Sequence, residues 1–154
     1  MKYLVFIVEN DVAQQKMFKV HLEEVLGKYT VKPFPNPTDL IEHLKEKPFA
    51  VVLAHFFGPE VKTGVHYLKE MKKQYPLIPV IYYTTHEDPA LRAEVMALGA
   101  EEYILKDSAS LVRLRTTLDS IHTNVISKKY HWRNLIKNIL NMGNNTNLIA
   151  TLNY

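Results

Sequence analysis

The chain has 154 residues, of which 47% are hydrophobic and 23% are charged. This composition is typical of a globular protein with a packed core, and it excludes a chain that is disordered throughout. The sequence contains no cysteine, which excludes disulfides, thiolate zinc sites and cysteine nucleophiles. The length favours one domain of ordinary size with an appendage.

Charge is distributed unevenly along the chain. Residues 106–154 carry seven Lys or Arg against two Asp, a net +5, so the first 105 residues carry −2 of the total of +3. A basic C-terminal segment after an acidic body suggests contact with something acidic. For any single lysine, a solvated helix face is the simpler explanation.

The N-terminal apolar run does not predict export. It extends from Tyr3 to Val8 and stops at Glu9, which is too short for the hydrophobic part of a signal peptide. No other stretch approaches the length that spans a bilayer. We expect a cytoplasmic protein that does not involve a membrane.

Short apolar runs alternate with amphipathic segments five times. Continuous apolar runs are typical of strands buried on both faces, and Asp, Asn and Pro are typical of helix starts. The alternation predicts an α/β fold, a doubly wound parallel sheet with helices on both faces. The expected strands are Tyr3–Val8, Thr30–Phe34, Phe49–Ala54, Pro79–Tyr83 and Glu102–Leu105; the expected helices are Val12–Leu26 (with Phe18, Leu22, Val25 and Leu26 on its apolar face), one beginning at Asn36 and Pro37, one following Gly64, and one from Asp88 to near Gly99.

In such a sheet, binding sites form where the strands end. The residues there are Glu9-Asn10-Asp11, Ala54-His55, Thr84-Thr85 and Lys106. This ordered set resembles the receiver domain of response regulators, over about residues 2–125. The resemblance implies a flavodoxin-like (βα)5 sheet of strand order 2-1-3-4-5. It also implies a pocket in which two acids and an acceptor aspartate bind Mg²⁺, while a Thr and a Lys contact the phosphoryl group.

The acidic half of that pocket is degenerate in this chain. Glu9 keeps one carboxylate and Asn10 is neutral, and Ala54 stands 30 residues before Thr84, where the resemblance places the acceptor aspartate. No Asp or Glu occurs in residues 49–59. We therefore expect no phosphorylation at the usual position, loss of the Mg²⁺ site, no cofactor or metal, and no enzymatic activity.

The remaining pocket residues have expected roles that are mainly structural. Lys106 is expected to pair with Glu9, and Thr84 to cap the following turn. Tyr103 resembles the aromatic switch residue of the family. His55 would enter the pocket only if the strand slipped by one residue. A zinc site of Glu9, His55 and His86 is disfavoured because the three lie on different loops without ligand spacing.

After Lys106 the apolar residues follow a heptad seam, broken only by Lys128. We expect residues 1–126 to form the receiver-like domain and residues 127–154 a helical extension with a loosely held tail, Asn144–Tyr154. A single long helix that pairs with a second copy is favoured over a break near Ser127 with a short helix Tyr130–Met142 folded back. The seam consists of Leu111, Leu114, Leu118, Ile121, Val125, Lys128, Trp132, Leu135, Ile139 and Met142.

The function that the sequence predicts is a phosphorylation-independent, receiver-like signalling module that binds other signalling proteins or a second copy of itself. The fourth helix, fifth strand and last helix are the expected surfaces. One alternative is an active phosphorelay receiver with an unorthodox acceptor. Another is a nucleic-acid-binding regulator that uses the basic C-terminal helix, although the helix has no helix-turn-helix and its basic residues form no single stripe.

Overall fold

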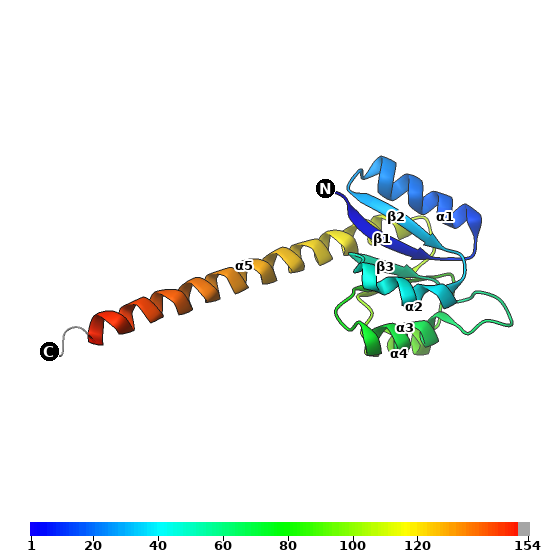
Figure 1. The fold of residues 1–154 in the computed structure, drawn as a ribbon. Helices are drawn as coiled ribbons and strands as arrows, with labels where there is room; N and C mark the ends of the chain where they lie inside the picture. The colour runs from blue at the N-terminus through cyan, green and yellow to red at the C-terminus, as the bar shows by residue number, and fades with distance from the viewer. Residues whose placement is uncertain (151–154) are drawn as a thin grey trace. The chain divides into compact units, whose positions relative to one another are not determined.

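The computed structural model describes the backbone of residues 1–150 and the side chains of residues 1–143 (Figure 1). Its strands form one parallel sheet of order β2-β1-β3-β4-β5, which confirms the predicted flavodoxin-like topology. The strands are β1 (Tyr3–Val8), β2 (Tyr29–Phe34), β3 (Ala50–Leu53), β4 (Val80–Thr84) and β5 (Glu102–Leu105), and the α-helices are α1 (Val12–Lys19), α2 (Leu40–His43), α3 (Gly64–Gln74), α4 (Pro89–Ala97) and α5 (Ser110–Ala150).

The two faces of the sheet are covered by different helices. Because side chains alternate along a strand, Phe6 and Val8 of β1 lie on one face with the core residues of α2, α3 and α4. On the other face, the ring of Tyr83 contacts Phe18 of α1 at 4.9 Å, and its hydroxyl bonds the hydroxyl of Ser110 at the start of α5. Both faces of the strands are therefore dry, which explains their continuous apolar sequences.

Side-chain caps begin three of the helical segments. Asp11 accepts hydrogen bonds from the main-chain N–H groups that open α1, Asn36 caps η2 (Pro37–Asp39), and Asp88 caps α4. These caps satisfy N–H groups that a helix start leaves unpaired. The helix expected after Asn36 is broken into three pieces, η2, α2 and η3 (Leu44–Glu46), and it ends where Lys47 adopts a left-handed conformation.

The first helix differs from its prediction in its second half. After Lys19 it widens into a π-helix, η1 (Val20–Val25), before Gly27 turns the chain with a φ of 67°. A π-helix has more residues per turn, so the apolar periodicity of an α-helix no longer holds. Leu22 is buried as predicted, but Val25 is 67% exposed, so its expected place on the buried face is wrong.

The last helix, α5, continues from Ser110 to Ala150 without a break, so the fold-back near Ser127 is wrong. Its first turns belong to a compact unit of residues 1–118, and the rest to a second unit of residues 119–154. The expected boundary after residue 126 stays a prediction. Of the tail expected to be loosely held, residues 144–150 continue the helix, and residues 151–154 lie outside the described residues.

Candidate functional site

The carboxyl ends of β1, β3, β4 and β5 bring four of the predicted pocket residues to one edge of the sheet. Val8 is in register with Leu53, and the N–H of Ala54 donates to the carbonyl of Val8 at 3.0 Å. On the other side, the N–H of Lys106 donates to the carbonyl of Thr84 at 2.8 Å. The sheet register therefore fixes the main-chain positions from which four side chains extend: those of Glu9, Ala54, Thr84 and Lys106.

Glu9 and Lys106 form the expected ion pair. The Nζ of Lys106 lies 2.7 Å from Oε2 of Glu9, and the two side chains are only 19% and 6% exposed. The other carboxylate oxygen of Glu9 accepts a hydrogen bond from the N–H of Asp11 at 3.0 Å. Both oxygens of this carboxylate are thus occupied by groups of the protein itself.

Ala54 follows β3 and is 5% exposed. Its methyl group carries no nucleophile and no metal-binding oxygen. Gly64 closes tightly over it: a Cβ on Gly64 would lie 2.1 Å from the carbonyl oxygen of Ala54 and 2.7 Å from the hydroxyl of Tyr82. Only glycine fits such an approach. In the sequence, Gly64 indicates only the start of a helix, and no local pattern predicts this contact.

Thr84 and Asn10 have different surroundings. The hydroxyl of Thr84 is buried and accepts a hydrogen bond from the N–H of His86 at 3.0 Å, as expected of a turn cap. Asn10, at the position of the second acid in the resemblance, is exposed.

These residues do not form a donor set for Mg²⁺, which takes hard oxygen ligands, carboxylates above all. Glu9 is the only carboxylate among Glu9, Asn10 and Ala54, and both of its oxygens are already hydrogen-bonded. Within the part of the chain whose side chains are described, no group of three His, Cys, Asp or Glu residues is placed to hold a metal ion.

Tyr103 is buried, at 4% exposure, and it is held on several sides. Its hydroxyl donates to the carbonyl of His86, its ring stacks on Tyr82 with centroids 5.6 Å apart, and the guanidinium of Arg92 lies over it at 5.5 Å. Burial, and then the nearby charge of Asp88, raises the pKa of the Tyr103 hydroxyl. The residue predicted as a switch therefore occupies the inward position.

His55 is bound to Tyr82. Its Nδ1 shares a hydrogen bond of 2.6 Å with the Tyr82 hydroxyl, and its ring lies 5.2 Å from that of His86. Burial, and then the charge of His86, lowers the pKa of His55, while burial first of all raises the pKa of Tyr82. Both groups are therefore neutral at pH 7. This pair could not be predicted from the sequence, because two side chains 27 positions apart leave no local signal.

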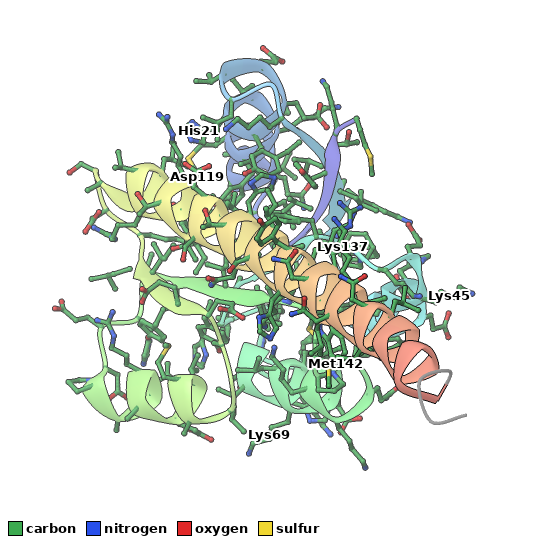
Figure 2. All side chains as sticks on the ribbon, turned by 90° about the vertical axis from the view of Figure 1, so that its left-hand side faces the viewer. His21, Lys45, Lys69, Asp119, Lys137 and Met142 are labelled. Carbon is green, nitrogen blue, oxygen red and sulfur yellow. The ribbon has the colours of Figure 1, made fainter. Side chains whose placement is uncertain are left out.

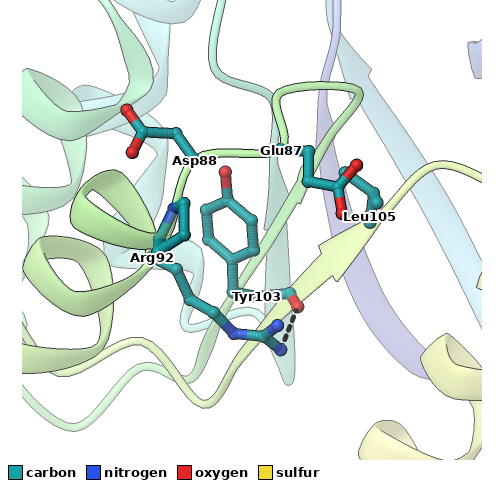
Figure 3. A pocket seen from close by; sticks show the side chains of 6 residues that line it. Glu87, Asp88, Arg92, Tyr103 and Leu105 are labelled. Carbon is teal, nitrogen blue, oxygen red and sulfur yellow. Dashed lines mark hydrogen bonds between the residues drawn. The ribbon is translucent and has the colours of Figure 1, made fainter.

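A hollow of about 260 Å³ lies where α4 meets β5 (Figure 3). Its walls include Glu87, Asp88 and Tyr103, and the guanidinium of Arg92 donates to the carbonyl of Tyr103 at 3.2 Å, the dashed line in the figure. Tyr103, the predicted switch residue, thus lines a hollow on the predicted binding surface, which is formed by the fourth helix and the fifth strand.

The predicted seam changes role along α5. Leu114, Leu118 and Ile121 are at most 4% exposed, so these three belong to the core and are not available to a partner, contrary to the prediction. From Val125 onward the seam is exposed, with Trp132 at 62%. An amphipathic stripe has one sequence pattern whether a sheet or a partner covers it. None of the helices in the described part of the chain combines the length and hydropathy needed to span a bilayer.

The sequence matches known signalling proteins. The profile of the response regulator receiver domain family matches residues 5–119. A putative NtrX-like response regulator from Rickettsia felis is 29% identical over 104 residues, which cover 66% of this chain and 21% of that protein. The transcriptional regulatory protein YdfI of Bacillus subtilis is 32% identical over 76 residues, covering 49% of this chain and 35% of YdfI. The chain therefore spans only part of the length of these relatives.

Solved structures agree in fold. The BeF3-activated receiver domain of DrrB has a TM-score of 0.62 at 24% identity, covering 77% of this chain and 99% of that one. The signal receiver domain of a protein described as a putative Luxo repressor from Vibrio parahaemolyticus has a TM-score of 0.69 at 20% identity, covering 82% of this chain and 98% of that one. With the profile match over most of its length, the chain belongs to the response regulator receiver domain family.

Proposed function

We propose that this receiver domain signals without being phosphorylated on an aspartate, and that it acts by binding other proteins, with a second copy of itself as one possible partner. The observation that carries the proposal is the alanine at position 54, directly after β3, in a pocket where the positive charge of the lysine is already paired with a carboxylate. Ala54 supplies no carboxylate, and the Lys106 ammonium is bound to Glu9 at 2.7 Å.

The ion pair supports this proposal on electrostatic grounds. In a phosphorylating pocket, metal and lysine charges stabilise the incoming phosphoryl group. Here the lysine charge is balanced by a buried carboxylate, and that carboxylate is held in turn by the N–H of Asp11. A phosphoryl group would have to displace an existing contact, without an acceptor to receive it.

The proposed protein-binding surface is the face formed by α4, β5 and the start of α5, where Tyr103 is one of the residues that line the hollow of Figure 3. The inward rotamer of Tyr103 is held by contacts from Tyr82, His86 and Arg92. A fixed rotamer presents one constant surface, which suits a module whose output depends on association.

The test is phosphorylation by a small phosphodonor, such as phosphoramidate with Mg²⁺, followed by intact-protein mass spectrometry. We expect no phosphoryl adduct on the parent chain and an acid- and base-labile adduct on the restored variant with both Asn10→Asp and Ala54→Asp. A labelled parent overturns the proposal. In that case His55→Asn distinguishes a histidine acceptor, whose adduct the substitution removes, from an acceptor elsewhere.

A further inference from the structure

The C-terminal part of α5 carries a series of exposed apolar side chains. We call residues 125–142 the arm; Lys137 and Met142 within it are labelled in Figure 2. Between Val125 and Leu140 its large apolar side chains are 40–67% exposed. These side chains are Val125, Ile126, Tyr130, Trp132, Leu135, Ile136, Ile139 and Leu140.

The arm is also purely basic. The sequence contains no Asp or Glu after Asp119, whereas the arm contains four cationic residues: Lys128, Lys129, Arg133 and Lys137. Nothing in the arm can neutralise these charges. An occupant of the arm that carries negative charge is therefore electrostatically favoured.

Helix geometry places the cations around the apolar face. At about 100° per residue, Trp132 lies near the middle of an arc of roughly 140° that holds most of these apolar side chains: Val125, Trp132, Leu135, Ile136, Ile139 and Leu140. Ile126 and Tyr130 lie outside this arc, about 120° and 160° from Trp132. Lys128 and Lys129 fall inside this arc, about 50° to either side of its centre, and Arg133 and Lys137 continue from one edge. The opposite side carries Tyr130, uncharged polar residues and one histidine: Ser127, His131, Asn134, Asn138 and Asn141.

A second copy of the chain fits this arrangement poorly. The two-stranded seam would enclose Lys128 at a core position, and a parallel, in-register pair would place the two Lys128 ammonium groups opposite each other. Neither arm could offer an acid to the other's cations. The arc is also wider than a two-stranded seam covers, which would leave Leu140 wet.

A lipid surface fits both features. Lysine side chains inside an apolar arc extend along it and place their ammonium groups among the headgroups, whereas a protein groove would enclose them. Tryptophan is favoured at the boundary between headgroups and acyl chains. We propose that the arm binds the surface of an anionic lipid bilayer, lying in its plane with Trp132 at the level of the headgroups. This goes beyond the proposed function and departs from the expectation that no membrane is involved, although it requires no membrane-spanning helix.

The single tryptophan of the chain is Trp132, so its fluorescence reports on the arm alone. The experiment titrates the full chain with vesicles of phosphatidylcholine alone or of phosphatidylcholine mixed with phosphatidylglycerol, and measures the emission spectrum and co-sedimentation. We expect a blue shift and sedimentation with the anionic vesicles only, both weakened by salt. Each cation near an anionic surface strengthens binding about fivefold, so replacing Lys129, Arg133 and Lys137 by Gln weakens it about a hundredfold.

The matched control replaces three exposed lysines of the body, Lys19, Lys62 and Lys73, by Gln and changes the net charge equally. If this control variant binds anionic vesicles within a few-fold of the parent, the proposal is supported. An equal loss of binding in both triple variants refutes it, because the attraction would then not be local to the arm. Binding that is equally strong with neutral vesicles also refutes it. So does a chain that is dimeric by light scattering, with Trp132 emission already blue-shifted and unchanged by vesicles; that result assigns the face to a second copy.

Discussion

Removal of one member of the buried ion pair should destabilise the protein much more than removal of an exposed pair. At an effective dielectric constant of about 20, unit charges at the 2.7 Å separation of Lys106 and Glu9 attract by ~6 kcal/mol. Desolvation of the two ions cancels several kcal/mol of this attraction. We therefore expect a coupling free energy of about 2 kcal/mol, and a cost of about 2–4 kcal/mol for Lys106→Met, which leaves a carboxylate that is 6% exposed without its cation.

The assay is urea unfolding followed by circular dichroism for the parent, Lys106→Met, Glu9→Gln and the double variant. The double variant should lose less than the sum of the two single losses, by the coupling free energy. Lys69 and Glu94, 3.7 Å apart and at least half exposed, provide the control pair, for which each variant should cost less than about 1 kcal/mol. Additive losses for Lys106 and Glu9 would refute the reasoning, because the two charges would then not stabilise each other.

Three further predictions concern the neighbouring contacts. Gly64→Ala should cost at least about 3 kcal/mol of unfolding free energy, because its Cβ would lie 2.1 Å from the Ala54 carbonyl oxygen; a melting temperature equal to the parent's would contradict the packing. Burial holds the pKa of His55 below 6.5 in the folded chain, so the unfolded chain binds more protons just below pH 6.5 and the free energy of unfolding falls as the pH drops there. In His55→Gln this fall should be shallower. Equal slopes of unfolding free energy against pH in the parent and the variant would exclude His55 as the cause. Tyr103→Phe removes the hydrogen bond to a main-chain carbonyl and should cost about 1–2 kcal/mol in urea unfolding.

The elements that the sequence predicts well are those whose signals are local. Apolar runs identify the five strands, and the caps Asp11, Asn36 and Asp88 identify three helix starts. The strand ends then follow from the parallel order, which is why Glu9 and Lys106 could be paired in advance although 97 positions separate them.

The features that the sequence does not predict depend on non-local contacts. The bond between His55 and Tyr82 and the approach of Gly64 to Ala54 exist only once β3, β4 and α3 are assembled. The π-helix η1 interrupts the α-helical period, so the pattern placed Val25 on the wrong face. In α5 the heptad pattern is broken only at Lys128, but burial stops earlier, after Ile121, and no residue type marks that point.

A receiver without an acyl phosphate needs another source of energy for any change of state. A ligand shifts an equilibrium between two conformations only by its difference in affinity for them. Tyr103 is held inward by stacking, a hydrogen bond and a cation–π contact, each worth about 1 kcal/mol. Under the proposed function, phosphorylation at position 54 does not supply the few kcal/mol that oppose them, and a partner would have to do so by contacting α4 and β5 better when Tyr103 is displaced. If no such partner exists, the domain has a single conformation. Its signal then consists only of its location in the cell and of the proteins that it binds there.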